Sequence, residues 1–155
     1  MGHTVNSIVI NAPYDLVFDV SNKIERWTEL FGKEYASADV LERKDDKGTG
    51  NIEITFRLTD EDKKSRVSKR WLFKDLKFAY AQRWEPLFPF NYMKIVWYYT
   101  ETPDGIKMTW IQDFEMDAKF TKFTPEQIEG FINKHSQDNM KIFKQVIEQE
   151  ALAAE

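Results

Sequence analysis

The residue types able to do chemistry are restricted in this chain of 155 residues, which has no cysteine and only two histidines, His3 and His135. Without cysteine there is no thiol nucleophile and no thiolate metal site. Two histidines far apart in the sequence argue against a histidine-based metal centre. The sequence also lacks a G-x-S-x-G elbow, a phosphate loop and a dinucleotide fingerprint. Any catalysis must therefore use tyrosine, arginine, serine, lysine or carboxylate side chains, and we expect no metal and no cofactor.

Two polar residues, His135 and Asn139, interrupt an apolar helical stripe near the end of the chain. Steps of seven, four, three and four from Ile128 reach His135, Asn139, Ile142 and Val146, which places them on one helix face. A buried polar group needs a hydrogen-bond partner or water. Two interpretations stay open. In the structural one, His135 and Asn139 are hydrogen-bonded within the core, or the stripe is slightly rotated. In the functional one, this helix face lines a wet or ligand-filled cavity.

The segment Ser65–Phe73 is typical of a strand, but its two faces are hard to rank. One face carries Val67, Lys69, Trp71 and Phe73, and the other carries Arg66, Ser68, Arg70 and Leu72. Periodicity alone favours burial of the first face. The pattern therefore predicts that Ser68 and Arg70 face solvent.

Composition and charge limit the class of protein. Aromatic residues make up 15% of the chain, including five tryptophans, which fits a large aromatic core or the wall of a ligand pocket. Composition alone favours the core. A net charge of −4 argues against nucleic acid as a partner. No apolar run is long enough to span a membrane, and no targeting signal is apparent, so we expect a cytoplasmic protein without a membrane partner.

The order of predicted elements indicates one α+β domain over residues 1–155. A strand at Thr4–Asn11 precedes two short helices, and a capping box at Thr124 begins a helix that runs to about Glu150. The short helices are expected at Pro13–Ser21 and Ile24–Phe31, and the further strands at Tyr35–Arg43, around Ile52–Leu58, Ser65–Phe73, Lys77–Trp84, Tyr92–Thr100 and Ile106–Met116. An antiparallel sheet of about seven strands must curl, and only the long helix can fill its concave side. Such a helix-grip arrangement tends to leave a hollow.

Three segments carry a resemblance to a known family: Asn6–Pro13, Ile24–Phe31 and Trp110–Met116. They resemble the monodomain aromatase/cyclases of bacterial type II polyketide synthesis, of the START/Bet v 1-like superfamily, over about residues 6–149. The resemblance implies the same helix-grip fold. It also implies an enzyme that folds a carrier-bound poly-β-ketone, closes the first ring by aldol chemistry and dehydrates that ring to an aromatic.

The resemblance also implies site residues, and it contradicts the strand pattern by placing Ser68 and Arg70 in the cavity. Tyr35 resembles the active-site tyrosine of the family. Other positions match pocket residues: Trp27, Phe31, Arg83, Met93, Trp97, Trp110 and Asn139. The chain departs from the family through one extra residue in Gly32–Glu34, another in Glu85–Tyr92, and Lys64 and Arg66 at tryptophan positions. We therefore expect Lys64 and Arg66 to make the pocket more polar and more basic, and His135 has no counterpart.

Roles follow as hypotheses from these positions. Arg70 holds a carbonyl and stabilises enolate or alkoxide charge, Tyr35 is the general acid, and Ser68 orients a carbonyl or a water. His135 is a candidate base. The expected partners are a minimal polyketide synthase and its acidic acyl carrier protein, docking near Lys119 and Lys122, and the chain is expected to be a monomer.

Two other functions remain open. The first is a non-catalytic carrier of a lipid, quinone or other hydrophobic molecule with the same fold, which predicts an apolar cavity with Ser68 and Arg70 in solvent. The second is a stress-type protein with no defined ligand. The direction of the Ser65–Phe73 side chains separates the enzyme from the carrier.

Overall fold

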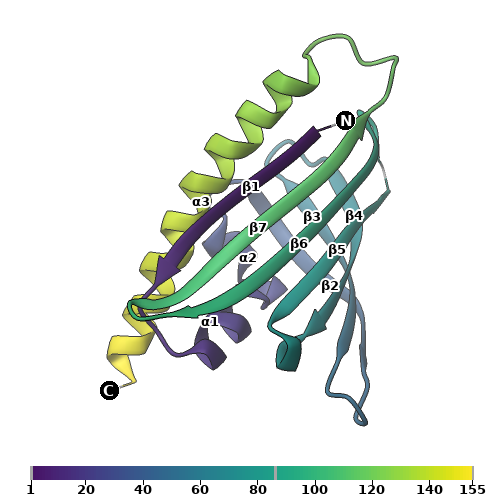
Figure 1. The fold of residues 1–155 in the computed structure, drawn as a ribbon. Helices are drawn as coiled ribbons and strands as arrows, with labels where there is room; N and C mark the ends of the chain where they lie inside the picture. Colours follow the sequence, from purple (N-terminus) through teal and green to yellow (C-terminus); the bar gives the residue numbers. More distant parts are fainter. Residues whose placement is uncertain (1, 86, 155) are drawn as a thin grey trace.

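The computed structural model describes residues 2–85 and 87–154, which form a curved antiparallel sheet that wraps a long helix (Figure 1). The sheet has seven strands in the order β1-β7-β6-β5-β4-β3-β2. The strands are β1 (Gly2–Ile10), β2 (Tyr35–Asp45), β3 (Ile52–Asp60), β4 (Ser65–Phe73), β5 (Phe78–Glu85), β6 (Phe90–Thr102) and β7 (Gly105–Met116). The predicted helix-grip fold is confirmed.

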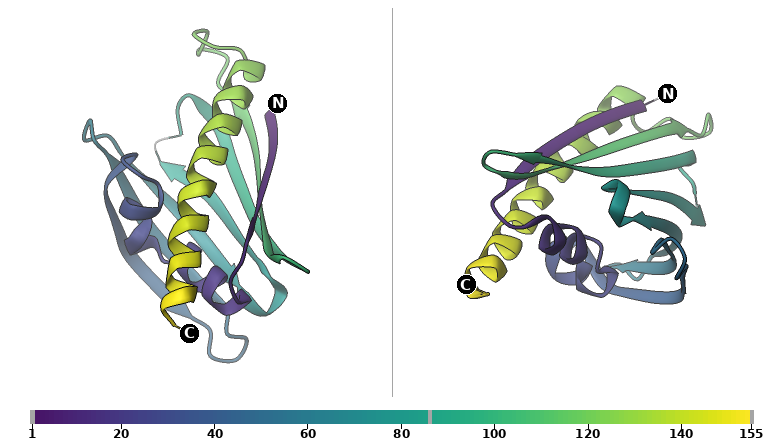
Figure 2. Two further views of the ribbon diagram at one scale, coloured as in Figure 1. Left: turned by 90° about the vertical axis from the view of Figure 1, so that its left-hand side faces the viewer. Right: turned by 60° about the horizontal axis from the view of Figure 1, so that its bottom comes forward.

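The helices close the open side of the curved sheet (Figure 2). The short helices α1 (Tyr14–Ser21), η1 (Ile24–Arg26) and α2 (Trp27–Leu30) follow β1, while η2 (Lys74–Leu76) joins β4 to β5. The long helix α3 (Pro125–Ala153) packs along β1. Sheet, short helices and α3 thus enclose the interior from three directions.

The N-terminus of α3 is built as its sequence predicts. Thr124 Oγ1 accepts a hydrogen bond from the backbone N–H of Gln127, and Gln127 Oε1 accepts one from the backbone N–H of Thr124. Pro125 occupies the first turn, where its missing N–H costs nothing. This reciprocal cap satisfies two donors that no helical carbonyl can reach, so the helix begins at a defined residue.

The buried face of α3 is rotated slightly from the predicted stripe. Its fully buried residues are Ser136, Asn139, Met140, Phe143 and Ile147. Phe131, although apolar, is 52% exposed near the N-terminal end of α3. The rotation is one of the two alternatives that the pattern left open, and it moves His135 to the edge of the buried face.

Candidate active site

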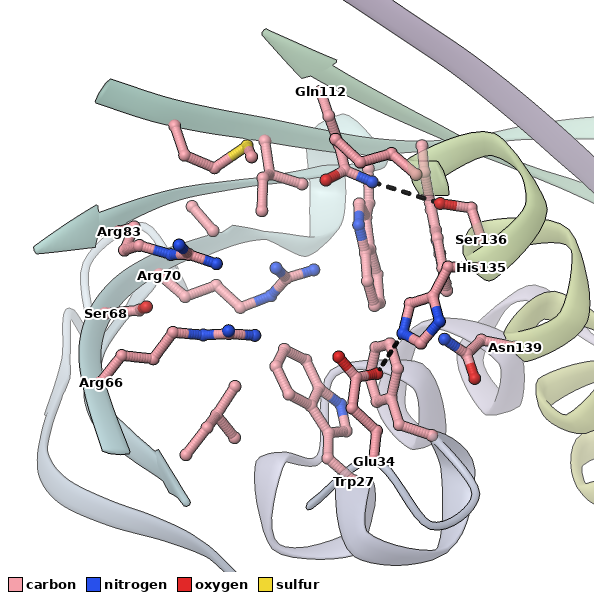
Figure 3. A pocket seen from close by; sticks show the side chains of 18 of the residues that line it. Trp27, Glu34, Arg66, Ser68, Arg70, Arg83, Gln112, His135, Ser136 and Asn139 are labelled. Carbon is pink, nitrogen blue, oxygen red and sulfur yellow. Dashed lines mark hydrogen bonds and ion pairs between the residues drawn. The ribbon is translucent and has the colours of Figure 1, made fainter. Parts of the chain in front are cut away.

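A cavity of about 350 Å³ lies between the concave face of the sheet, the short helices and α3 (Figure 3). Twelve of the residues predicted above line it: Trp27, Phe31, Tyr35, Arg66, Ser68, Arg70, Arg83, Met93, Trp97, Trp110, His135 and Asn139. Lys64, expected with Arg66 in the pocket wall, is instead exposed and is not among the lining residues, because it precedes the start of β4 in the turn. The structure tests their position only, and their chemical roles remain predictions.

Strand β4 points Ser68 and Arg70 into this cavity, so the solvent-facing orientation predicted from periodicity is wrong. Ser68 is 8% exposed and Arg70 is 1% exposed. The periodicity misleads because the outer face of the sheet is also aromatic. Trp71 stacks on Tyr80 with ring centres 5.5 Å apart, and this pair stands on the outer face, where it resembles core in a sequence pattern.

Arg70 is the largest fully buried side chain, and it lies against aromatic rings. Its guanidinium carbon is 4.1 Å from the ring centre of Trp97 and 5.4 Å from that of Trp27. Burial lowers the pKa of Arg70 to about 10, which leaves the group charged at neutral pH. Arg70 Nη2 has no hydrogen-bond partner among the described residues. The arrangement suits a cation held ready for a ligand oxygen.

A buried hydrogen-bond network fixes Arg70 from behind. Arg70 Nε donates to Asn22 Oδ1 at 3.0 Å, and Asn22 Nδ2 donates to the Tyr99 hydroxyl at 3.0 Å. The Tyr99 hydroxyl is also 2.8 Å from Ser21 Oγ. Sequence analysis missed Asn22, because an isolated asparagine after a short helix has no distinctive pattern.

Replacing Asn22 with leucine is expected to destabilise the fold by about 1–3 kcal/mol, because buried Arg70 Nε loses its acceptor. Urea unfolding at neutral pH measures this change. Asn11→Leu is the control, since Asn11 is exposed and such substitutions usually stay within about 0.5 kcal/mol. Equal destabilisation by the two variants would show that the Arg70–Asn22 contact contributes nothing.

Tyr35 is the first residue of β2, and its side chain lines the same cavity. The loop before it turns at Gly32, whose φ of +62° favours glycine. Tyr35 is 8% exposed, and burial raises its pKa well above the ordinary value. Its hydroxyl accepts a hydrogen bond from Arg66 Nη2 at 2.6 Å. The hydroxyl therefore keeps its proton at neutral pH. Because a raised pKa also makes it a weak acid, it can protonate only a strongly basic group such as an alkoxide.

His135 forms an ion pair with a residue that sequence analysis did not select, Glu34. The two side chains approach from α3 and from the loop before β2, with His135 Nε2 2.7 Å from Glu34 Oε2, and both line the cavity (Figure 3). The hydrogen bond to Glu34 raises the pKa of His135 above its usual value. The extra residue in Gly32–Glu34 was the available signal for Glu34.

This ion pair predicts a pH-dependent contribution to stability. Because the folded-state pKa of His135 is raised, its stabilisation is fully present below the unfolded pKa of about 6.5 and is lost as pH rises through the folded value. His135→Gln should therefore destabilise the protein more at about pH 5.5 than at about pH 8.5. Urea unfolding at both pH values tests this. In a Glu34→Gln background the pH-dependent difference should vanish, and its persistence would contradict the pairing.

Aromatic rings form a continuous slab on the floor of the cavity. Trp97 and Trp110 stack with ring centres 4.3 Å apart and planes 10° apart, and Phe31 stacks on Trp110 at 5.9 Å. Trp27 is 5.7 Å from Trp97. Aromatic surface of this kind suits an apolar or conjugated ligand. The aromatic content thus serves both as core and as cavity wall.

Further polar groups line the α3 side. Gln112 Nε2 donates to Ser136 Oγ at 3.3 Å, and Asn139 Nδ2 and Trp110 Nε1 have no partner among the described residues. Gln112 interrupted an apolar strand face, which was a usable signal, whereas Ser136 stood beside the predicted stripe. The cavity is therefore mixed in polarity, contrary to what the apolar-carrier hypothesis predicts.

Neither a metal-binding cluster nor a membrane-spanning helix occurs in the described part of the chain. Across residues 2–85 and 87–154, no cluster of three or more histidine, aspartate or glutamate side chains could hold a metal ion. Within the same residues, no helix has the length and apolarity needed to cross a membrane.

Comparison with known proteins identifies the family, although no family model matches the chain. A protein from Streptomyces cyaneus that is named as a polyketide cyclase is 43% identical to this chain over 153 residues. The match covers 96% of this chain and 95% of the relative. A second protein so named, from Streptomyces halstedii, is 45% identical over 115 residues, covering 71% of this chain and 98% of the relative. The chain belongs to the polyketide cyclase family. The family resemblance seen in the sequence is thereby confirmed.

Solved structures with a similar fold include proteins of low sequence identity to this polyketide cyclase family member. The ZhuI aromatase/cyclase of a Streptomyces species superposes with a TM-score of 0.68 at 17% identity, covering 96% of this chain and 92% of that one. A START superfamily protein from Mycobacterium smegmatis superposes with a TM-score of 0.66 at 11% identity over the full length of both chains. At such identities the likeness concerns the fold alone.

Proposed function

We propose that this polyketide cyclase folds a carrier-bound poly-β-ketone in its cavity, closes the first ring by an aldol reaction and dehydrates that ring to an aromatic. The observation that carries the proposal is the orientation of the β4 side chains, because Ser68 and Arg70 point into the aromatic cavity. A non-catalytic carrier predicted these side chains in solvent and an apolar cavity, and neither prediction agrees with the structure.

The first requirement is to choose which carbon atoms meet. Poly-β-ketones cyclise without help, so the enzyme gains most by restricting the bound conformation. The slab of Trp97, Trp110 and Phe31 supports one side of an extended chain. Polar groups opposite the slab can hold individual carbonyl oxygens in register.

The second requirement is to stabilise charge during ring closure. A new bond joins an enolate carbon to a carbonyl carbon, and negative charge develops on that carbonyl oxygen. Arg70 cannot serve as a base near neutral pH because its guanidinium stays protonated. It is suited to bind this oxygen, since its unpartnered Nη2 is already desolvated. Ser68, on the same face, orients a carbonyl or a water molecule.

The third requirement is proton transfer and loss of water. Tyr35 donates a proton to the alkoxide and is reprotonated from solvent. The hydroxyl group then leaves as water with a second proton from Tyr35, while a base removes a proton from the adjacent carbon. The raised pKa of Tyr35 keeps it protonated before this step. The Glu34–His135 pair, whose carboxylate belongs to the residue that precedes Tyr35 in the chain, is the candidate base for the carbon proton. The electron pair of that C–H bond forms the new double bond.

Carrier-protein docking is proposed at the loop between β7 and α3. Lys119 and Lys122 are exposed there. Aromatic contacts run from this loop to the cavity, since Phe123 lies 5.0 Å from Phe131, which lines it. An acidic carrier protein bound to the lysines would deliver its chain over this rim. Replacing both lysines with glutamate is expected to slow processing of a carrier-bound chain, and no change would exclude this docking site.

Reconstitution with a minimal polyketide synthase tests the function. The wild-type chain should convert the mixture of spontaneous products into one compound with an aromatised first ring, detected by chromatography and mass spectrometry. An unchanged product mixture would contradict the proposed activity.

A further inference from the structure

Two arginines on one wall of the cavity are not explained by the carbonyl-binding role of Arg70. Arg66 lies two residues before Ser68 on the same face of β4, and Arg83 on β5 is the partner of Ser68 across the ladder. Arg66 and Arg83 are therefore diagonal neighbours in the sheet. Figure 3 shows both guanidinium groups extending into the cavity beside Arg70.

These half-buried arginines lack the carboxylates that commonly accompany cations removed from water. Among the side chains that the structure describes, neither Arg66 nor Arg83 forms an ion pair. Arg66 donates through Nη2 to Tyr35, and no hydrogen bond from Arg83 is found in the described part of the chain. Burial, and next the like charge of Arg66, lower the pKa of Arg83 to about 10. Two cations are thus held close together at a cost in free energy.

The remaining charged and titratable groups around the cavity do not neutralise this pair. Tyr35 from β2 is protonated because burial raises its pKa. Glu34 is the acidic residue of the cavity lining, and it attracts Arg83, but its Oε2 already pairs with His135 from α3. Arg70 adds a further positive charge from β4. The wall has an excess of positive charge that an anionic ligand would balance.

We propose that Arg66 and Arg83 form a second subsite, which binds a planar group with two oxygen atoms that share one negative charge. Guanidinium groups present paired N–H donors that match this geometry. Two kinds of ligand contain such a planar anionic group: the carboxylate of a released acid is the first source, and the ionised 1,3-diketone unit of a poly-β-ketone is the second. The second source rests on the proposed function, whereas the first does not.

The carboxylate source is tested with 2-naphthoate and its neutral amide, 2-naphthamide, as probes. Binding is followed by quenching of the fluorescence of the cavity tryptophans, Trp27, Trp97 and Trp110. The wild-type protein should bind the carboxylate at least about tenfold more tightly than the amide, as expected for charge-assisted hydrogen bonds. This comparison needs no variant and is independent of any effect of mutation on folding.

The diketone source is tested with benzoylacetone and its 2,2-dimethyl derivative. Benzoylacetone can lose a proton to the buffer and become an enolate, whereas the dimethyl compound has no proton on its central carbon. Binding at the subsite should raise the enolate fraction at neutral pH, which shifts the ultraviolet absorbance of the probe. The blocked compound should bind more weakly, by about tenfold.

Arg66→Gln and Arg83→Gln should each reduce the preference for the anionic probe by about tenfold. Lys69→Gln is the matched control, because it removes one positive charge from the same strand but on the outer face, where Lys69 pairs with Glu53. A preference for the anionic probe in only one of the two comparisons supports the subsite and identifies whether its ligand is a carboxylate or an ionised diketone. Equal binding of charged and neutral probes in both arms would overturn the proposal, as would equal effects of the three variants.

Failure of this inference is distinguishable from failure of the proposed function. If the wild-type protein directs first-ring closure in the reconstituted synthase but binds the charged and neutral probes equally in both comparisons, the subsite is wrong and the function stands. If it discriminates the probes through Arg66 and Arg83 but leaves the polyketide mixture unchanged, the subsite stands and the cyclase proposal fails.

Discussion

Arg70→Gln is expected to lower the rate of enzyme-dependent first-ring closure about 100-fold, the usual effect of removing a donor that binds a developing oxyanion. The products should shift toward misfolded shunt compounds, because spontaneous cyclisation continues without guidance. The reconstituted synthase measures both the rate and the product ratio. Arg70→Lys, which keeps the charge but not the guanidinium geometry, should recover only part of the loss.

The fold is expected to survive this substitution. Burial lowers the pKa of Arg70, which means that its desolvated charge costs stability that glutamine does not. Circular dichroism and thermal unfolding establish this point. Arg57→Gln, on an exposed position of β3, is the control for loss of an arginine elsewhere. Wild-type product distribution from a folded Arg70→Gln protein would exclude Arg70 from the chemistry.

Tyr35→Phe is expected to lower formation of the aromatic ring by about 100-fold, the smaller end of the range for a general acid. Ring closure without proton delivery should leave a hydrated ring, heavier than the aromatic product by one water molecule. Mass spectrometry of the reconstituted reaction separates the two. The substitution removes only a hydroxyl group, so the ring contact between Phe31 and position 35 is retained.

Tyr80→Phe is the matched control for this prediction. Tyr80 stacks on Trp71 on the outer face of the sheet, away from the cavity lining. Its replacement should leave the ratio of hydrated to aromatic product unchanged. If Tyr35→Phe also leaves that ratio unchanged, the proton for dehydration comes from another group.

Element order and length were predictable from local signals. The capping box at Thr124 and Pro125 defines where α3 begins, and the turn before Gly105 defines the β6–β7 hairpin. The alternation in Ile106–Met116 matches the inward face of β7, on which Ile106, Met108, Trp110 and Phe114 are buried. These signals are local because capping, turn geometry and two-residue periodicity depend on neighbouring residues.

The site residues could be predicted only through the family resemblance. Periodicity in β4 gave the wrong orientation for Ser68 and Arg70, because aromatic pairs also cover the outer face of the sheet. Asn22 carries no local signal, and Glu34 is marked only by the extra residue in Gly32–Glu34. Their partners, Arg70 and His135, are separated from them by 48 and 101 residues, so only the folded chain brings these groups together.

By itself, the sequence determined an α+β chain that curls an antiparallel sheet around one long helix, because hydrophobic periodicity and helix capping act over short distances. The tertiary structure decided that the aromatic residues enclose a cavity of about 350 Å³ and that Arg66, Arg70 and Arg83 face into it. The physical reason is that the side chains that point toward the core are those on the face that the curved sheet encloses. Local pattern cannot specify this when both faces are partly apolar.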